Sequence, residues 1–153
     1  MNRTDLFETL GLSHFFYGRS FEYEIGNISL NVDGSAFKIL DDICIQEHLT
    51  PLRGAWRRLT LDEAIKLSRA AFQFDLAYST SEHMSASQAQ DFQEQLLGRM
   101  NINECEFYTN WYQNPWEAKD GVGWNSLTKS TFDMAIVLID TTKVVFTCFE
   151  SED

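Results

Sequence analysis

Two apolar segments near the end of the chain constrain the fold more than any other feature. Residues 134–139 form an uninterrupted apolar run within a segment from 131 to 140, and a second apolar segment covers residues 143–149. Segments of this length are typical of strands, and a strand without polar alternation is covered on both of its faces. We therefore predict a β-hairpin, turning at Asp140-Thr141-Thr142-Lys143, whose first strand is central in a sheet.

The rest of the chain is predicted to alternate between strands and helices. Extended segments are expected over residues 20–32, 36–40 and 102–112, and the turn signal Asp33-Gly34 would join the first two as a hairpin. Helices are expected over residues 4–10, 60–77 and 86–97, the second beginning at a capping box of Thr60 and Glu63. Residues 41–58 show no clear pattern.

No repeat or linker divides residues 1–153, which are expected to form one domain. The order of the predicted elements indicates an α+β fold, with an antiparallel sheet and two main helices packed on one side.

The charge of the chain limits its partners. Its 12 Lys and Arg stand against 23 Asp and Glu, a formal net charge of −11. Coulomb repulsion then opposes direct binding to nucleic acid or to an anionic membrane. The excess lies at the two ends: residues 1–50 hold 3 basic and 8 acidic side chains, residues 51–100 hold 6 of each, and residues 101–153 hold 3 and 9. The acidic charge permits three explanations: plain solubility, cation binding, or an acidic face that docks to a basic protein.

Compartment signals favour the cytoplasm. No apolar run approaches the ~20 residues that span a bilayer, and the first residues contain no apolar signal-peptide core. Cys44, Cys105 and Cys148 share no C-x-x-C spacing and are odd in number, so we expect reduced thiols, buried as small apolar groups.

Catalytic and metal-binding motifs are missing from the sequence. His14, His48 and His83 lie far apart in no zinc-binding spacing, and neither a phosphate-binding loop nor a nucleophile elbow occurs. We therefore expect no enzymatic activity, no metal and no cofactor. The carboxylate pairs Glu22/Glu24 and Glu104/Glu106 leave an alternative open, since side chains two apart on a strand share a face. Each pair is either a solvated strand face or part of a small enzyme or cation-binding site.

One aromatic cluster has the composition of a binding surface. Six aromatic residues fall between positions 107 and 124, interleaved with acidic side chains. Phe107, Trp124 and Trp111 are candidates for the core, yet aromatic anchors surrounded by charge are also typical of protein-binding hot spots. We predict a partner-binding site made of Glu104, Glu106, Trp111, Tyr112, Trp116, Glu117 and Asp120, and a secondary patch made of Glu22, Glu24, Asp41 and Asp42.

The end of the chain resembles a known family. Trp124-Asn125-Ser126-Leu127-Thr128, then Ser130-Thr131-Phe132-Asp133, a strand, a turn, a second strand and the acidic end Glu150-Ser151-Glu152-Asp153 resemble the C-terminal signature of bacterial immunity proteins. These are paired with contact-dependent growth-inhibition toxins and related polymorphic toxins. The resemblance covers about thirty residues. Thr131, Phe132 and Asp133 carry it, and we expect them to hold the fold, with Asp133 bonding backbone groups where the strand begins.

The resemblance implies a cytoplasmic inhibitor that binds the effector domain of a cognate toxin, often a basic nuclease, by stoichiometric occlusion. Acidic side chains would speed association with such a basic domain. The first alternative is an acidic mimic of nucleic acid, of the kind that phages encode, which would carry carboxylates spaced like phosphates over an extended surface. The oligomeric state stays open.

Overall fold

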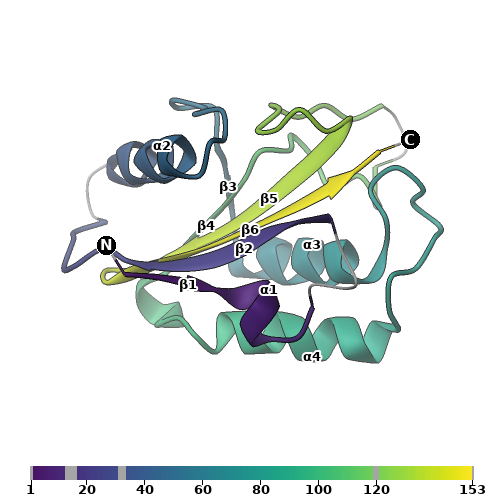
Figure 1. The fold of residues 1–153 in the computed structure, drawn as a ribbon, viewed down its shortest axis with the longest axis horizontal. Coiled ribbons are helices and arrows are strands. Elements are labelled where there is room, and N and C mark those ends of the chain that lie inside the picture. Colours follow the sequence, from purple (N-terminus) through teal and green to yellow (C-terminus); the bar gives the residue numbers. More distant parts are fainter. Residues whose placement is uncertain (1, 13–16, 31–33, 119–120, 153) are drawn as a thin grey trace.

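The computed structural model describes residues 2–12, 17–30, 34–118 and 121–152, which form a six-stranded antiparallel sheet with helices on both faces (Figure 1). The strand order is β1-β2-β6-β5-β4-β3. The strands are β1 (Arg3–Asp5), β2 (Tyr17–Glu24), β3 (Arg57–Leu59), β4 (Glu106–Thr109), β5 (Phe132–Ile139) and β6 (Lys143–Ser151). The helices are α1 (Leu6–Thr9), α2 (Ser35–Gln46), α3 (Leu61–Gln73), α4 (Ala86–Leu97) and the 3-10 helix η1 (Ile102–Glu104). The predicted α+β class is confirmed.

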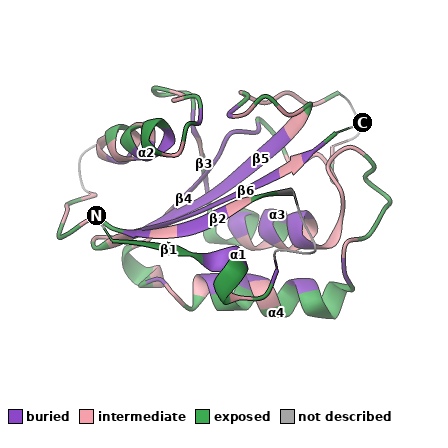
Figure 2. Cartoon of the chain, in the orientation of Figure 1, coloured by how far each residue is buried: buried purple, intermediate pink, exposed green. Residues whose placement is uncertain are grey.

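The hairpin of β5 and β6 forms the centre of the sheet, as predicted. β5 pairs with β4 on one side and with β6 on the other, and its alternate residues enter two separate cores. Met134, Ile136 and Leu138 face the core under α3 and α4, whereas Ala135, Val137 and Ile139 face the core under α2. Both faces of β5 are therefore buried (Figure 2), which explains why its sequence is an uninterrupted apolar run.

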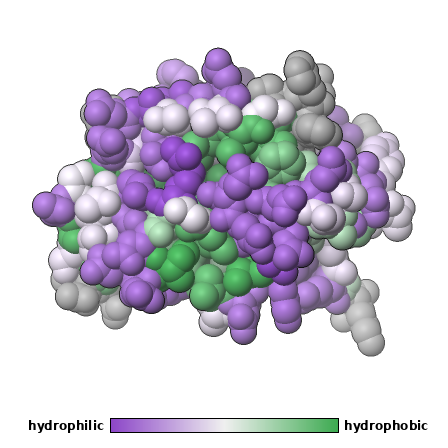
Figure 3. All heavy atoms as spheres, turned by 90° about the horizontal axis from the view of Figure 1, so that it is seen from below, coloured by the Kyte–Doolittle hydropathy of each residue, from purple (hydrophilic) through white to green (hydrophobic). Residues whose placement is uncertain are grey.

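Helices α3 and α4 pack together on one face of the sheet, as predicted for two main helices. Each begins with a capping box, and in α3 the Thr60 hydroxyl accepts from the Glu63 N–H while the Glu63 carboxylate accepts from the Thr60 N–H. Phe72 packs edge-on against Phe149 of β6, with ring centroids 5.2 Å apart. Seen from below, hydrophilic side chains divide the apolar ones on this side of the molecule into separate areas (Figure 3).

Helix α2 corrects the prediction for residues 36–40, which do not form a return strand. Ala36, Leu40, Ile43 and Cys44 recur at helical spacing, and α2 buries this stripe against the opposite face of the sheet from α3 and α4. Gly34 caps the helix at φ +79°, a conformation that favours glycine, so it starts a helix here and no hairpin strand follows. Asp33 lies outside the described residues.

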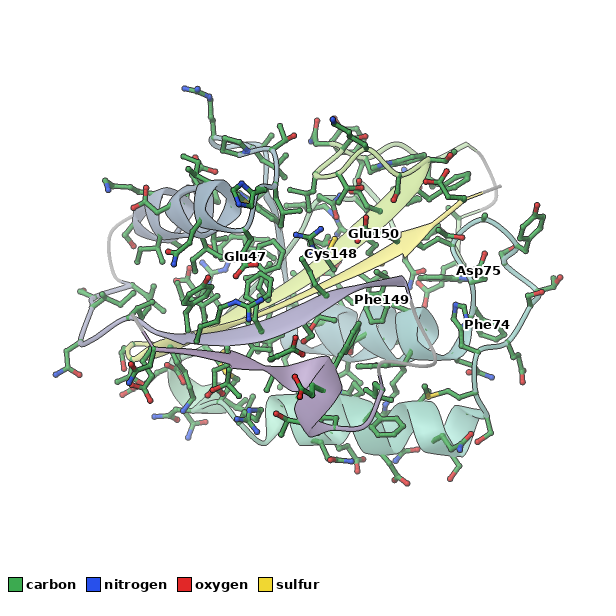
Figure 4. The ribbon with its side chains drawn as sticks, viewed as in Figure 1. Glu47, Phe74, Asp75, Cys148, Phe149 and Glu150 are labelled. Carbon is green, nitrogen blue, oxygen red and sulfur yellow. The ribbon has the colours of Figure 1, made fainter. Side chains whose placement is uncertain are left out.

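The end of α2 is fastened to the first two strands through Glu47. Its carboxylate accepts hydrogen bonds from Arg3 Nε and from the Tyr23 hydroxyl, both at 2.5 Å, and its carbonyl accepts from Arg19 at 2.8 Å. Figure 4 shows Glu47 between α2 and the sheet. Burial raises the pKa of Glu47, but the bonds and positive charges of its partners outweigh burial and leave the pKa lowered.

Four further expectations need adjustment. The predicted strand 20–32 ends at Glu24, and residues 25–30 are irregular. The predicted strand 102–112 is only β4, preceded by η1. The predicted helix 4–10 shortens to α1, and α3 ends at Gln73, before the predicted residue 77.

The cysteines are free thiols, and two of them are buried as expected. Cys44 and Cys148 lie in the core under α2, where burial raises the pKa of Cys44 to about 12. Cys105 is partly exposed. No helix in the described part of the chain is long and apolar enough to cross a membrane.

Candidate partner-binding site

The predicted binding residues do not form one surface. Glu104 and Glu106 lie near one end of β4, where Glu106 pairs with Ile139, while residues 111–118 follow the other end, beyond Thr109 paired with Ile136. Asp120 lies outside the described residues. The structure thus separates the two acidic members from the aromatic ones, because Glu104 lies in η1, Glu106 begins β4, and the chain leaves the strand after Thr109.

Trp111 is a core residue, which corrects its assignment as a surface anchor. It is 2% exposed and stacks on Trp124 at a centroid distance of 4.4 Å, and Trp124 stacks in turn on Phe132 at 5.3 Å. The Trp111 indole N–H donates to the Asp133 carbonyl at 2.6 Å. Because its ring is buried and its N–H is already hydrogen-bonded inside the protein, Trp111 has almost no accessible surface and no free donor for a partner.

Asp133 is the centre of a buried hydrogen-bond network where β5 begins. Its carboxylate accepts from the N–H groups of Leu127 and Thr128, from the Thr128 hydroxyl at 2.8 Å and from the Asn110 side-chain amide at 2.9 Å. Burial raises the pKa of Asp133, and these donors partly oppose the rise. The expectation that Asp133 bonds backbone groups at the start of the strand is confirmed.

We call this cluster the aromatic joint. Its members connect residues 110–111 and 124–128 to the start of β5 and are Asn110, Trp111, Trp124, Leu127, Thr128, Phe132 and Asp133. Five of the residues quoted for the resemblance belong to it, namely Trp124, Leu127, Thr128, Phe132 and Asp133. Those residues therefore account for the local fold rather than for a binding surface.

Next to the joint lies a groove of about 290 Å³, which we call the Tyr112 groove. One wall comes from β3 and the first turns of α3, and the other comes from the loop after β4. It is lined by Arg57, Leu59, Asp62, Glu63, Lys66, Leu67, Tyr112, Gln113, Asn114 and Glu117. Tyr112 and Glu117 were predicted from sequence. Asp62 and Lys66 were not, since only the tertiary fold brings α3 beside this loop.

Tyr112 is exposed and yet held in place. Its side chain is 55% exposed, while its N–H donates to the Gly123 carbonyl at 2.9 Å and its hydroxyl donates to Asn125 Oδ1 at 3.1 Å. The ring passes so close to Gly123 that a Cβ there would lie 2.9 Å from Tyr112 Cδ2. An exposed aromatic ring fixed in this way loses little conformational entropy when a partner covers it.

The charged side chains of the groove differ in how far they are engaged. Arg57 donates to the Trp111 carbonyl at 2.8 Å and to Glu63 at 3.1 Å. The hydrogen bond from the Thr60 N–H lowers the pKa of Glu63, and the Arg57 guanidinium lowers it further. Asp62, Lys66 and Glu117 form no ion pair with any residue that the structure describes.

Trp116 precedes the groove residue Glu117 in the chain but does not itself line the groove. It is partly buried and packs against the core under α3 and α4. Its indole N–H is buried and has no acceptor within the described residues. Trp116 therefore supports the loop that carries Tyr112 and Glu117 more than it offers a surface.

The Glu104/Glu106 pair does not form a shared site. Glu104 is in η1 and accepts from the Thr141 hydroxyl, while Glu106 accepts from the Tyr108 hydroxyl and lies 3.7 Å from Arg58. The two side chains differ in partners because only Glu106 belongs to a strand. The prediction that both project from one strand face is wrong.

The secondary patch is divided between opposite faces of the sheet. Glu22 on β2 pairs with Arg99 at 2.8 Å, and Glu24 accepts from Asn2. Asp41 and Asp42 are on α2, which covers the other face. Residues 36–40 were expected to be a strand beside residues 20–32, and the helix instead carries Asp41 and Asp42 away, so this grouping is wrong.

A cluster of Ser151, Asp75 and His83 resembles a hydrolase triad in composition but not in order. The Ser151 hydroxyl donates to the Asp75 carboxylate at 3.0 Å, and His83 Nε2 lies 3.4 Å from the same carboxylate. Figure 4 shows Asp75 beside Phe74 on the segment that follows α3. A nucleophilic serine needs the histidine as its base, whereas here the aspartate lies between the two. No group of three or more metal-binding side chains occurs among the described residues.

Neither a scan against protein-family models nor a search of curated proteins finds a match to this chain. The fold and the site therefore define the protein only as an α+β domain. It carries a rigid exposed tyrosine in a charged groove beside a buried joint.

Proposed function

We propose that this protein is a cytoplasmic immunity protein that neutralises the effector domain of a cognate bacterial toxin by stoichiometric binding. The observation that carries the proposal is the Tyr112 groove, in which a fixed aromatic ring lies beside Asp62 and Glu117, two carboxylates that form no ion pair with the described residues. Aromatic residues at rigid, partly exposed positions are the usual centres of protein-binding energy. The resemblance of the C-terminal segment supports the class of protein, and the net charge of −11 supports a basic effector such as a nuclease.

An acidic mimic of nucleic acid is the second candidate, and the arrangement of carboxylates favours it less. Several of them are engaged with arginine inside the fold, among them Glu22, Glu47, Glu63 and Glu106. A mimic of nucleic acid needs a long row of solvated carboxylates, because it must reproduce the regular spacing of charged phosphates along the backbone. A groove centred on a tyrosine fits a protein partner better.

A small enzyme or cation-binding domain is the third candidate. Its predicted carboxylate pairs are occupied, because Glu22 binds Arg99 and Glu106 binds Tyr108 and Arg58. The hollow of about 340 Å³ beside Glu22 and Glu24 also contains Lys143, a cation that competes with a metal ion for those carboxylates. We therefore propose that the protein has no enzymatic activity.

The test begins with the neighbouring gene. A large exoprotein or an orphan toxin module encoded next to this chain supplies the candidate toxin. Co-expression of the toxin module with this protein is expected to restore growth, and the purified proteins are expected to elute as a 1:1 complex. If both proteins are soluble and growth is not restored, the proposal is wrong.

The interface is tested with two matched double variants. Tyr112→Ala with Glu117→Lys changes the groove, while Tyr78→Ala with Asp91→Lys makes the same chemical changes at a tyrosine that is 58% exposed and at an exposed carboxylate of α4. We expect the groove variant to lose at least about tenfold in affinity, as for a hot-spot residue, and the control to keep wild-type affinity. Equal affinities would exclude the groove as the interface.

A further inference from the structure

We infer that the Tyr112 groove receives a single arginine side chain of the partner, with the guanidinium stacked on the Tyr112 ring beside the carboxylates of Glu117 and Asp62. The inference rests on the proposed function, because it names the chemistry by which the proposed partner is recognised. It also makes a statement about the isolated protein, which can be tested without the toxin.

The first argument is the size of the groove. Its volume of about 290 Å³ lies just below the range of sites that enclose drug-sized ligands, which begins at about 300 Å³. One wall is the first part of α3 and the other is the loop after β4, so the space is suited to one long side chain that enters from solvent. A folded domain can insert such a side chain without rearranging its backbone.

The second argument is the aromatic surface. The Tyr112 ring lies against the Gly123 backbone, while its hydroxyl is bonded to Asn125 and its side chain is 55% exposed. One part of the ring is thus supported from within the protein and another part is open to solvent. A cation over the face of a tyrosine ring is attracted by the ring quadrupole, and arginine also stacks on it as a flat group.

The third argument is the charge that remains after internal pairing. Glu63 and Arg57 neutralise each other at 3.1 Å, which leaves Asp62 and Glu117 against Lys66. The residual charge is negative and favours a cation. Lys66 is the one groove cation among the described residues that has no ion pair, so it opposes the incoming arginine and lowers the affinity.

The test is a titration of the isotope-labelled protein, without the toxin, followed by NMR. The probe is N-acetyl-arginine amide, and its controls are N-acetyl-lysine amide and the uncharged N-acetyl-citrulline amide. We expect saturable shifts confined to residues 112–118 and 61–66, with millimolar affinity for the arginine probe, weaker binding of the lysine probe and none of the citrulline probe. Shifts elsewhere, or equal shifts with citrulline, would overturn the inference.

Charge variants provide the sharper test, because they should act in opposite directions. Glu117→Lys is expected to weaken the arginine probe about threefold and Lys66→Glu to strengthen it about threefold, the size of a solvent-exposed ion pair. Tyr112→Ala should abolish the localised shifts. Lys129→Glu makes the same charge change at an exposed site outside the groove and is expected to leave the affinity unchanged. If Lys66→Glu and Lys129→Glu behave alike, the arginine does not occupy the groove.

The outcome can be separated from that of the proposed function. If the protein restores growth beside the toxin and Tyr112→Ala protects equally well, the immunity function stands and the arginine site is wrong. If the titration succeeds and growth is not restored, the groove binds arginine but the immunity function is wrong.

Discussion

Trp111 and Tyr112 are neighbours in the chain and have opposite environments. Trp111 belongs to the aromatic joint, is 2% exposed and is bonded to the Asp133 carbonyl, whereas Tyr112 is 55% exposed and faces the groove. Both are fixed by the same segment, since Tyr112 bonds Gly123 and Asn125 while Trp111 stacks on Trp124 between them. The difference shows that the same set of contacts with residues 123–125 can bury one residue in the core and hold the next residue exposed to solvent.

The largest expected effect is the difference in unfolding free energy between Trp111→Ala and Tyr112→Ala. Truncating a buried tryptophan costs about 4 kcal/mol of unfolding free energy, because it leaves a cavity and removes the bond to Asp133. Truncating Tyr112 should cost less than about 1 kcal/mol, because the ring is more than half exposed. Urea denaturation measures both. Similar losses would mean that the joint and the groove are not distinct.

Asp133→Ala should be the next most damaging change. It removes the acceptor for the buried Leu127 N–H and for the partly buried Thr128 N–H, and a buried donor without an acceptor costs about 1–3 kcal/mol. We expect a loss of about 3 kcal/mol in chemical denaturation, against less than about 0.5 kcal/mol for Asp91→Ala on the exposed side of α4. A loss below 1 kcal/mol for Asp133→Ala would show that the joint does not depend on the carboxylate.

Gly123→Ala tests the connection between the joint and the groove. The new Cβ would lie 2.9 Å from Tyr112 Cδ2, so the ring must swing away and release Asn125, at a cost of about 1 kcal/mol. Gly121→Ala is the control in the same loop, since its Cβ would meet nothing within 4 Å. The near-ultraviolet circular dichroism and the NMR signals of the Tyr112 ring should change only in Gly123→Ala. An unchanged ring would mean that Gly123 does not position it.

The smallest expected effect is a difference in how the stability of the Tyr112 groove and that of the aromatic joint depend on pH. The pKa of Glu63 in the groove is lowered, so its ionised form stabilises the fold above the unfolded pKa, and this contribution is lost as the pH falls through the folded pKa. Glu63→Gln keeps a cap but loses the charge, and should be about 0.5 kcal/mol less stable than the wild type at pH 7.

The difference in unfolding free energy between the wild type and Glu63→Gln should shrink as the pH falls through the folded pKa of Glu63, as followed by denaturation from pH 7 into acid. In the aromatic joint, the titration of Asp133 changes the stability with pH in the opposite direction. Because the pKa of Asp133 is raised, the stability gained from this titration is complete below the unfolded pKa and is lost as the pH rises through the folded pKa. A constant difference between wild type and Glu63→Gln at every pH would show that the charge of Glu63 plays no part.

The elements that could be predicted are those whose signal is local. The capping box of Thr60 and Glu63 predicted the start of α3, and the apolar run identified β5 as a central strand. Ala36, Leu40, Ile43 and Cys44 have the helical spacing of α2, but the Asp33-Gly34 dipeptide before them favours a hairpin turn. Gly34 serves as a helix cap, a role that the dipeptide alone does not distinguish from a turn.

The candidate site was predictable only in part. Tyr112 and Glu117 stood out by composition, and they line the groove. Trp111, Glu104 and Glu106 stood out equally and do not, because alternation along a supposed strand 102–112 could not show that β4 ends at Thr109. The opposite wall of the groove, with Asp62 and Lys66, comes from a helix that begins about fifty residues earlier, and no local pattern connects the two.

The sequence by itself determined the class of the fold, the central hairpin, the capping box of α3 and the role of Asp133 at the start of β5. Each of these depends on hydrogen bonds and burial between residues close in the chain, or on periodicity within one segment. Only the tertiary structure decided which aromatic residues are buried and which carboxylates remain without a partner. Those outcomes depend on packing between distant segments, where the position of one helix changes the environment of every side chain that it covers.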